Sequence, residues 1–196
     1  TKKYSWNSYD SNLYQKLSFF EKKLINLSKK YKISISIIRP TLIYDDIGRN
    51  SDNNISTLLK IMKKTFILPL PNHTGLRQPI HYSQLGESIL SISKSYRLNK
   101  KNKSQNIINL GGDEELTYQE ILNRIKKSFP ASDSINNCIF IKMPNRLYFL
   151  LCIPILIFSP KLFEAIQRIT VNMNGFSKSY EVSGSERKKF PVRSKI

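Results

Sequence analysis

The chain has 196 residues, of which 40% are hydrophobic and 11% aromatic, and its formal net charge is +18. This apolar share is enough to build a core, which excludes a generally disordered chain, and the length fits one domain or one and a half. The longest apolar run, 147–158, is interrupted by Pro154 and is too short to span a bilayer. The chain begins at Thr1 rather than at a methionine, so we expect it to be a fragment of a longer protein.

Basic residues dominate the charge, with 32 Lys and Arg against 14 Asp and Glu. The cations are scattered in pairs such as Lys22-Lys23 and Lys126-Lys127, without zinc-finger spacing or aromatic–basic interleaving. Net charge alone indicates non-specific attraction, so we expect no specific nucleic-acid partner. Two alternatives stay open. One is an acidic ligand such as a nucleotide diphosphate, and the other is a basic peripheral protein whose 147–158 segment rests on lipid.

Cysteine and histidine placement predicts no metal centre. Cys138 and Cys152 form no CxxC pair, and His73 and His81 supply no further ligand spacing. Both cysteines have apolar neighbours in the sequence, which is typical of buried structural thiols in a reducing compartment. We therefore expect a cytoplasmic protein.

The first predicted element is a helix, because apolar residues recur every three or four positions: Leu13, Leu17, Phe20, Leu24, Leu27 and Tyr31. Asn12 is its candidate N-cap. The alternating run 33–38 follows directly and predicts a strand that ends at Arg39-Pro40, because proline donates no ladder hydrogen bond. A helix that leads straight into a strand is typical of a layered α/β sheet.

The rest of the chain continues this alternation. After a polar loop we expect helices over 55–64, 83–96 and from Thr117, where Thr117 and Glu120 form a capping box. We expect strands over 65–70, 107–110 and 139–143. The 147–158 run predicts a buried helix or a pair of turns, and Pro160 opens a last helix through Val171.

Three segments in this order resemble one family: Ile37–Tyr44 (IIRPTLIY), Leu76–His81 (LRQPIH) and Ile108–Thr117 (INLGGDEELT). They are similar to the C-terminal half of the NAD-dependent epimerase/dehydratase family, the extended short-chain dehydrogenase/reductases that act on nucleotide-sugars. The ending Phe190–Arg193 (FPVR) resembles the ending of that family, and the resemblance covers roughly 14–193.

The resemblance implies an α/β fold: the C-terminal part of a Rossmann-type doubly wound parallel sheet plus a small α/β substrate-binding subdomain. Residues 1–44 would belong to the dinucleotide-binding domain. Residues 45–196 would form mainly the substrate-binding subdomain, with 76–112 returning to the Rossmann sheet. We expect a chain cut through such a sheet to be poorly stable, because an edge strand and an apolar face are exposed.

The resemblance also implies site residues. The backbone of Pro40, Thr41 and Leu42 would lie against the nicotinamide of NAD or NADP, although Arg39-Pro40 alone is also a plain strand end. Arg77 is similar to the arginine that meets the nucleotide-sugar pyrophosphate, a task that suits a forked guanidinium. The other implied substrate-binding residues are Asn54, Gln78 and His81. A surface arginine and a packed, hydrogen-bonded histidine are the alternatives for Arg77 and His81.

The sequence departs from the family in three places, of which Gln84, where the family usually carries an aspartate, bears least on catalysis. It has no Gly-rich turn of the kind that cradles dinucleotide phosphates. In the family, a Tyr-x-x-x-Lys pair shares one helix face, and the lysine favours the phenolate that takes a hydroxyl proton. Tyr14 is the candidate catalytic tyrosine, but Leu17 or Ser18 holds the position of the lysine. The chain is most similar to the subgroup that lacks this pair.

The function implied is an NAD(P)-dependent nucleotide-sugar epimerase, dehydratase or reductase, active in surface-polysaccharide synthesis. Its partner is a nucleotide-sugar, and a homodimer is left open. We expect the fragment alone to be inactive. The missing lysine favours an alternative, a non-catalytic or regulatory protein that binds NAD(P) or nucleotide-sugars on the same fold.

Overall fold

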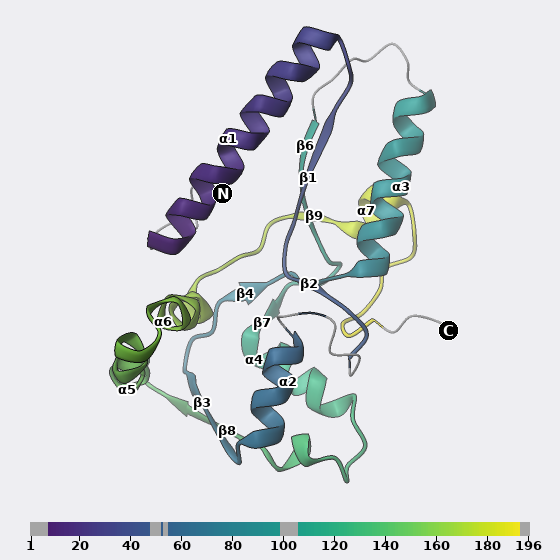
Figure 1. Ribbon diagram of the computed structural model, residues 1–196. Helices are drawn as coiled ribbons and strands as arrows, with labels where there is room; N and C mark the ends of the chain where they lie inside the picture. The colour runs from purple at the N-terminus through teal and green to yellow at the C-terminus, as the bar shows by residue number, and fades with distance from the viewer. Residues whose placement is uncertain (1–7, 48–51, 53–54, 99–105, 193–196) are drawn as a thin grey trace.

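The computed structural model describes residues 8–47, 52, 55–98 and 106–192 (Figure 1). Its elements are, in order, α1 (Ser8–Tyr31), β1 (Ser36–Pro40), β2 (Ile43–Tyr44), α2 (Ile55–Lys64), β3 (Ile67–Pro71), β4 (Leu76–Arg77), β5 (Ile80–His81), α3 (Tyr82–Leu98), β6 (Asn106–Gly111), β7 (Leu116–Thr117), α4 (Tyr118–Lys127), β8 (Ile139–Met143), α5 (Asn145–Phe158), α6 (Pro160–Gln167), β9 (Ser177–Lys178) and α7 (Ser179–Ser183). Short 3₁₀ helices span Ser134–Asn137 and Arg168–Thr170.

The main sheet is parallel and has the order β1-β6-β9. Ser36 to Pro40 pair with Asn106 to Leu110, and the end of β6 pairs with β9. Figure 1 shows α1 on one side of these strands and α3 on the other. Parallel strands with helices on both sides form a layered α/β arrangement, so the expected fold class is confirmed.

Three smaller strand pairs extend the molecule away from this sheet. The β2–β5 and β3–β8 pairs are parallel, and the β4–β7 pair is antiparallel. The buried core lies around α2 and α4, next to these pairs, rather than beneath α1. It consists of Tyr44, Ile55, Leu59, Met62, Leu70, Leu116, Ile121, Leu122, Ile125, Ile135, Cys138 and Phe190.

The first helix differs from the sequence expectation at both ends. It already runs at Ser8, so Asn12 lies inside α1 and is not its N-cap. At the other end, Lys32 adopts a φ of 53° and the Ile33 N–H bonds the Ser28 carbonyl at 3.0 Å, which is a Schellman-type helix end. This turn delays β1 to Ser36, three residues later than predicted. The apolar stripe of α1 is exposed, including Leu13, Leu17 and Phe20.

The apolar segment near the C-terminal end also differs from expectation. It forms one α-helix, α5, with Pro154 inside it, and most of its apolar side chains are exposed rather than buried. The helix from Pro160 ends at Gln167 and not at Val171. Beyond it, the carbonyls of Arg168 and Val171 accept hydrogen bonds from Arg77, which holds this stretch outside the α-helical ladder. Among the described residues, no helix is long and apolar enough to cross a membrane.

Candidate functional site

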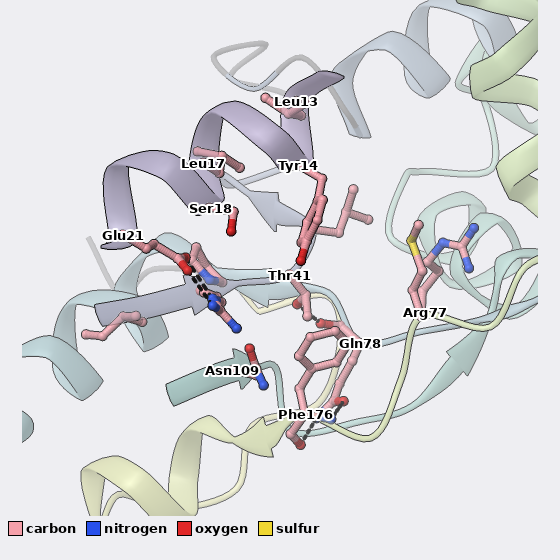
Figure 2. Close-up of a pocket in the computed structure, with 15 residues that line it drawn as sticks. Leu13, Tyr14, Leu17, Ser18, Glu21, Thr41, Arg77, Gln78, Asn109 and Phe176 are labelled. Atoms are coloured by element: carbon pink, nitrogen blue, oxygen red, sulfur yellow. Dashed lines mark hydrogen bonds and ion pairs between the residues drawn. The ribbon is translucent and has the colours of Figure 1, made fainter. Parts of the chain in front are cut away.

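A pocket of about 490 Å³ lies between α1 and the carboxyl end of β1 (Figure 2). Ligands of open α/β sheets bind at this edge, and the volume is within the range of small-molecule sites. Its wall is formed by Leu13, Tyr14, Leu17, Ser18, Glu21, Ile38, Arg39, Pro40, Thr41, Leu42, Arg77, Gln78, Asn109, Met173 and Phe176.

Most residues implied by the family resemblance line this one pocket. They are Tyr14 from α1, Pro40, Thr41 and Leu42 from the end of β1, and Arg77 and Gln78 from β4 and the residue after it. Asn54 lies outside the described residues. His81 is described but does not line the pocket.

Tyr14 lies in the pocket wall with Ser18 one helical turn further along α1. Figure 2 shows the Tyr14 ring reaching from α1 toward Thr41. Because residues four apart share a helix face, Ser18 stands at the position of the lysine in the Tyr-x-x-x-Lys pair of the family that the sequence resembles. The hydroxyl of serine carries no charge, so Ser18 does not supply the cation that a lysine would.

Arg39, from β1, places a guanidinium in the same pocket wall. The Arg39 Nε donates to Glu21 Oε1 at 2.8 Å, and a second guanidinium nitrogen donates to the other oxygen of Glu21. These hydrogen bonds lower the pKa of Glu21 and raise the pKa of Arg39. Both groups are therefore ionised, and the carboxylate offsets much of the positive charge that Arg39 presents to the pocket.

The segment after β1 is fixed by its own hydrogen bonds. The Thr41 N–H donates to the Leu110 carbonyl at 2.9 Å, and the Thr41 hydroxyl donates to the Gln78 carbonyl. The Leu42 carbonyl accepts the Ile80 N–H at 2.9 Å. These groups of Thr41 and Leu42 are therefore used within the protein and hold the pocket wall in place.

Arg77 and Gln78 also hold the wall together. The buried guanidinium of Arg77 donates to the carbonyls of Leu76, Arg168 and Val171, and it lies 5.9 Å from the ring centre of Tyr118. The Gln78 amide nitrogen donates to Gly112 and Phe176 carbonyls at 2.9 and 3.0 Å, and its oxygen accepts the Phe176 N–H at 3.0 Å. Arg77, at the end of β4, and Gln78, the next residue, thus both connect this part of the chain to residues 168–176.

Asn109 contributes a polar group to the pocket that the sequence motifs do not predict. Its Oδ1 is buried and has no hydrogen-bond partner among the described residues. Asn109 lies on β6 directly opposite Arg39, and both line the pocket. An unpaired buried acceptor is unusual, and a donor on a bound ligand would satisfy it.

His81 is packed in the interior instead. Its ring is fully buried, with Nδ1 2.8 Å from the Ser83 hydroxyl oxygen and its centre 5.1 Å from that of Tyr44. Burial lowers the pKa of His81, against the opposing influence of Asp46, whose Oδ1 is 3.4 Å from Nε2. Asp45, Asp46 and His81 offer oxygen and nitrogen atoms within 4.8 Å of one another, a chemistry compatible with a metal ion. Within the group, the Asp46 N–H donates to Asp45 Oδ1 at 2.7 Å.

No family model matches the chain. No curated protein matches it either. Among solved structures, it is similar to Pal from Bacillus thuringiensis, with a TM-score of 0.49 and 14% identity over 87% of this chain and 46% of that one. It is similar to the UDP-N-acetylglucosamine 4-epimerase from Bacillus cereus, with a TM-score of 0.45 and 15% identity over 83% and 46% of the two chains.

A third similar structure is the UDP-glucuronic acid 4-epimerase from Bacillus cereus in complex with NAD, with a TM-score of 0.48 and 16% identity over 86% of this chain and 44% of that one. The chain thus spans less than half the length of these three proteins. Each of the three TM-scores lies below 0.5, and the function of this chain is therefore inferred from its own residues.

Proposed function

We propose that the pocket binds a nucleotide-sugar, and that the chain is part of an NAD(P)-dependent nucleotide-sugar epimerase or dehydratase of surface-polysaccharide synthesis. One observation carries this proposal. Six residues implied by family motifs that lie far apart in the sequence, Tyr14, Pro40, Thr41, Leu42, Arg77 and Gln78, line a single pocket at the carboxyl edge of a parallel sheet. Open α/β sheets bind their ligands at this edge.

The residues of the pocket fit the nicotinamide end of the cofactor. Apolar side chains such as Leu13, Leu42 and Phe176 suit a flat ring, and the unpartnered Asn109 Oδ1 can accept from an amide or hydroxyl donor. The sequence holds no Gly-rich turn for the cofactor phosphates, so those would be held by other parts of a longer protein. When bound, NAD(P) supplies reversible hydride transfer at a sugar carbon.

In this proposal, the residues of the chain bind the sugar, exclude water and move a proton. Tyr14 exchanges a proton between its phenol oxygen and a sugar hydroxyl. We assign to Arg39, which lines the same pocket, the positive charge that a lysine supplies in the resembled family, partly offset by its ion pair with Glu21. The hydrogen bonds of Thr41 and Gln78 keep the wall in one geometry, as positioning of a bound substrate requires.

A second candidate function is non-catalytic binding of the same ligands. Two features favour non-catalytic binding. Ser18 stands at the position of the lysine, and the contact with Glu21 neutralises the charge of Arg39. Both candidates predict ligand binding, and they differ in turnover and in the role of Tyr14.

The experiment compares Tyr14→Phe with Tyr31→Phe, a matched change at an exposed tyrosine of the same helix. UDP-glucose binding is measured by calorimetry on the 196-residue chain, and turnover is measured with NAD⁺ in the longer protein that we propose to contain it. For an enzyme, Tyr14→Phe keeps binding and lowers turnover by about 10² to 10⁴-fold, while Tyr31→Phe changes neither.

Binding without turnover in the unaltered protein would establish the second candidate. Both candidates are wrong if UDP-glucose and the other nucleotide-sugars tested all have dissociation constants above about 1 mM.

A further inference from the structure

Helix α5 has an outward face without polar side chains from Leu147 to Phe158. Between Leu147 and Phe158, only Tyr148 and Cys152 carry a group able to form a side-chain hydrogen bond, and both are buried. Tyr148, Cys152 and the half-buried Ile155 form one narrow stripe at helical spacing, by which α5 packs on the rest of the molecule. Figure 1 shows α5 at the edge of the molecule with α6 beside it.

The opposite side of α5 exposes large apolar side chains, which are Leu147, Leu150, Leu151, Ile153, Leu156, Ile157 and Phe158. The two at the end of the helix are the most open, with 79% of Ile157 and 86% of Phe158 exposed. Single exposed apolar residues are ordinary, but a contiguous apolar face marks a surface that meets a partner or a membrane.

The sequence from 134 to 163 carries charge of one sign, and Glu164 on the neighbouring α6 lies just outside it. Residues 134–163 contain no Asp or Glu, whereas Lys142, Arg146 and Lys161 lie within this range. Arg146, Leu150, Ile153 and Ile157 follow one another at spacings of four and three, so Arg146 begins the same outward face. Arg146 and Lys142 are exposed. A long cationic side chain at the end of an apolar face can reach lipid phosphates while its stem stays among apolar groups.

We propose that α5 docks this protein on the surface of an anionic lipid bilayer. Its outward face would lie at the boundary between headgroups and acyl chains, with Arg146 and Lys142 meeting the phosphates. Specific protein interfaces set their register with about one hydrogen bond per 100–200 Å² and a polar rim. The outward face of α5 has no side-chain donor or acceptor between Leu147 and Phe158, and a fluid bilayer needs none. The net charge of +18 adds long-range attraction to anionic lipid.

The test is sedimentation of the 196-residue chain with vesicles of phosphatidylcholine alone and with about 30% phosphatidylglycerol. We expect binding to the anionic vesicles. The double variant Ile157→Ser/Phe158→Ser lowers the partition coefficient by about tenfold or more, because two apolar side chains no longer enter the bilayer. Arg146→Glu weakens binding to anionic vesicles and leaves the weak binding to neutral vesicles unchanged.

The matched control is Phe19→Ser/Phe20→Ser, which removes two adjacent exposed apolar side chains from α1 and should leave partition unchanged. Circular dichroism verifies that each variant keeps its helices. The proposal is wrong if the unaltered chain stays in the supernatant of anionic vesicles. It is also wrong if the α5 variant sediments as well as the unaltered chain, which would indicate attraction by charge alone. Loss of self-association by the α5 variant in light scattering, without vesicle binding, would identify a protein–protein surface instead.

Discussion

Gln78 is the side chain that connects most of the pocket wall. It is fully buried, its amide bonds Gly112 and Phe176, and its backbone carbonyl accepts the Thr41 hydroxyl. The amide is thus used in contacts between segments of the chain. Substrate binding by Gln78, implied by the resemblance, remains a prediction, and any such role would have to coexist with these contacts.

Replacing Gln78 with alanine should destabilise the fold by about 2–4 kcal/mol, because buried carbonyl and N–H groups lose their partners and a cavity remains. Urea unfolding measures this loss. Gln15→Ala is the control, since Gln15 is exposed on α1 and its replacement should stay within about 0.5 kcal/mol. Equal stability of the two variants would contradict the role given to the Gln78 amide.

His81 predicts a pH dependence of stability. Burial lowers the pKa of His81 below its ordinary value of 6.5, so the unfolded chain takes up a proton at a pH where the folded chain does not. Stability is therefore full above about pH 6.5 and declines as the pH falls from there toward the folded-state pKa. In urea unfolding at pH 7.5 and 5.5, His81→Asn should reduce this decline. His73→Asn, at the exposed histidine, should leave the decline intact, and a reversed ranking would refute the assignment.

Part of the site could be predicted residue by residue. The motifs around Arg39-Pro40 and Leu76–His81 led to Tyr14, Thr41, Arg77 and Gln78, which the structure brings to one pocket. Glu21 and Asn109 could not be found this way. Asn109 reaches the pocket only through its register opposite Arg39, and a pairing of strands some seventy residues apart leaves no local signal in either strand.

At the scale of elements, the helices could be predicted from apolar periodicity, whereas the pairing of the strands could not. The 55–64 helix and the capping box of α4 are as predicted, because each depends on neighbours within a few residues. Helix ends were predicted less well. The end of α1 depends on the positive φ of Lys32, and the end of α6 on hydrogen bonds from Arg77, which is more than ninety residues away.

The connection between β4 and β5 passes close to the end of β6, and this close approach requires glycine at position 112. A Cβ at Gly112 would lie 1.8 Å from the Pro79 carbonyl oxygen, and the Gly112 N–H bonds the Gln78 carbonyl at 3.2 Å. Backbone cannot move aside as a flexible side chain can, so the two segments approach too closely for any side chain at this position.

Gly112→Ala should therefore lower the free energy of unfolding by about 3 kcal/mol or more. Gly86→Ala is a contrasting change at the fifth residue of α3, where a Cβ meets nothing within 4 Å. It should raise stability by about 0.5–1 kcal/mol through helix propensity. Thermal unfolding followed by circular dichroism compares the two, and similar midpoints would disprove the close approach.

At the scale of the whole molecule, the three family-like segments meet around the C-terminal stretch. Tyr44 packs its ring against His81 and Phe190, and its hydroxyl oxygen accepts the Val192 N–H at 2.9 Å. The buried Asp113 accepts hydrogen bonds from Gln84, Ser179 and the N–H groups of Tyr180 and Lys188. These contacts tie residues 177–192 to α3 and to the end of β6.

Asp113→Asn should destabilise the fold by about 2–4 kcal/mol, because an amide nitrogen would face donors where a carboxylate oxygen accepted them. We also expect faster proteolysis within residues 177–192. Asp133→Asn serves as the control, since asparagine keeps the cap that Asp133 provides to the 3₁₀ helix at Ser134–Asn137. Unchanged proteolysis in Asp113→Asn would contradict the tie between α3 and the C-terminal stretch.

Helix α1 forms one wall of the pocket and buries little of its own apolar surface. Its apolar stripe is exposed, and the ion pair of Glu21 with Arg39 links it to the sheet. Elements with little buried surface open most readily, so α1 should exchange its amide hydrogens faster than β1 and β6 in the free protein. A ligand between α1 and β1 would slow that exchange.

Hydrogen exchange with and without UDP-glucose tests the proposed nucleotide-sugar pocket most directly, because it reports both binding and its position. We predict slower exchange in peptides that cover 13–21 and 38–42, with little change in those that cover α4. An absence of protection at saturating UDP-glucose, or protection confined to segments outside the pocket wall, would contradict a nucleotide-sugar site between α1 and β1.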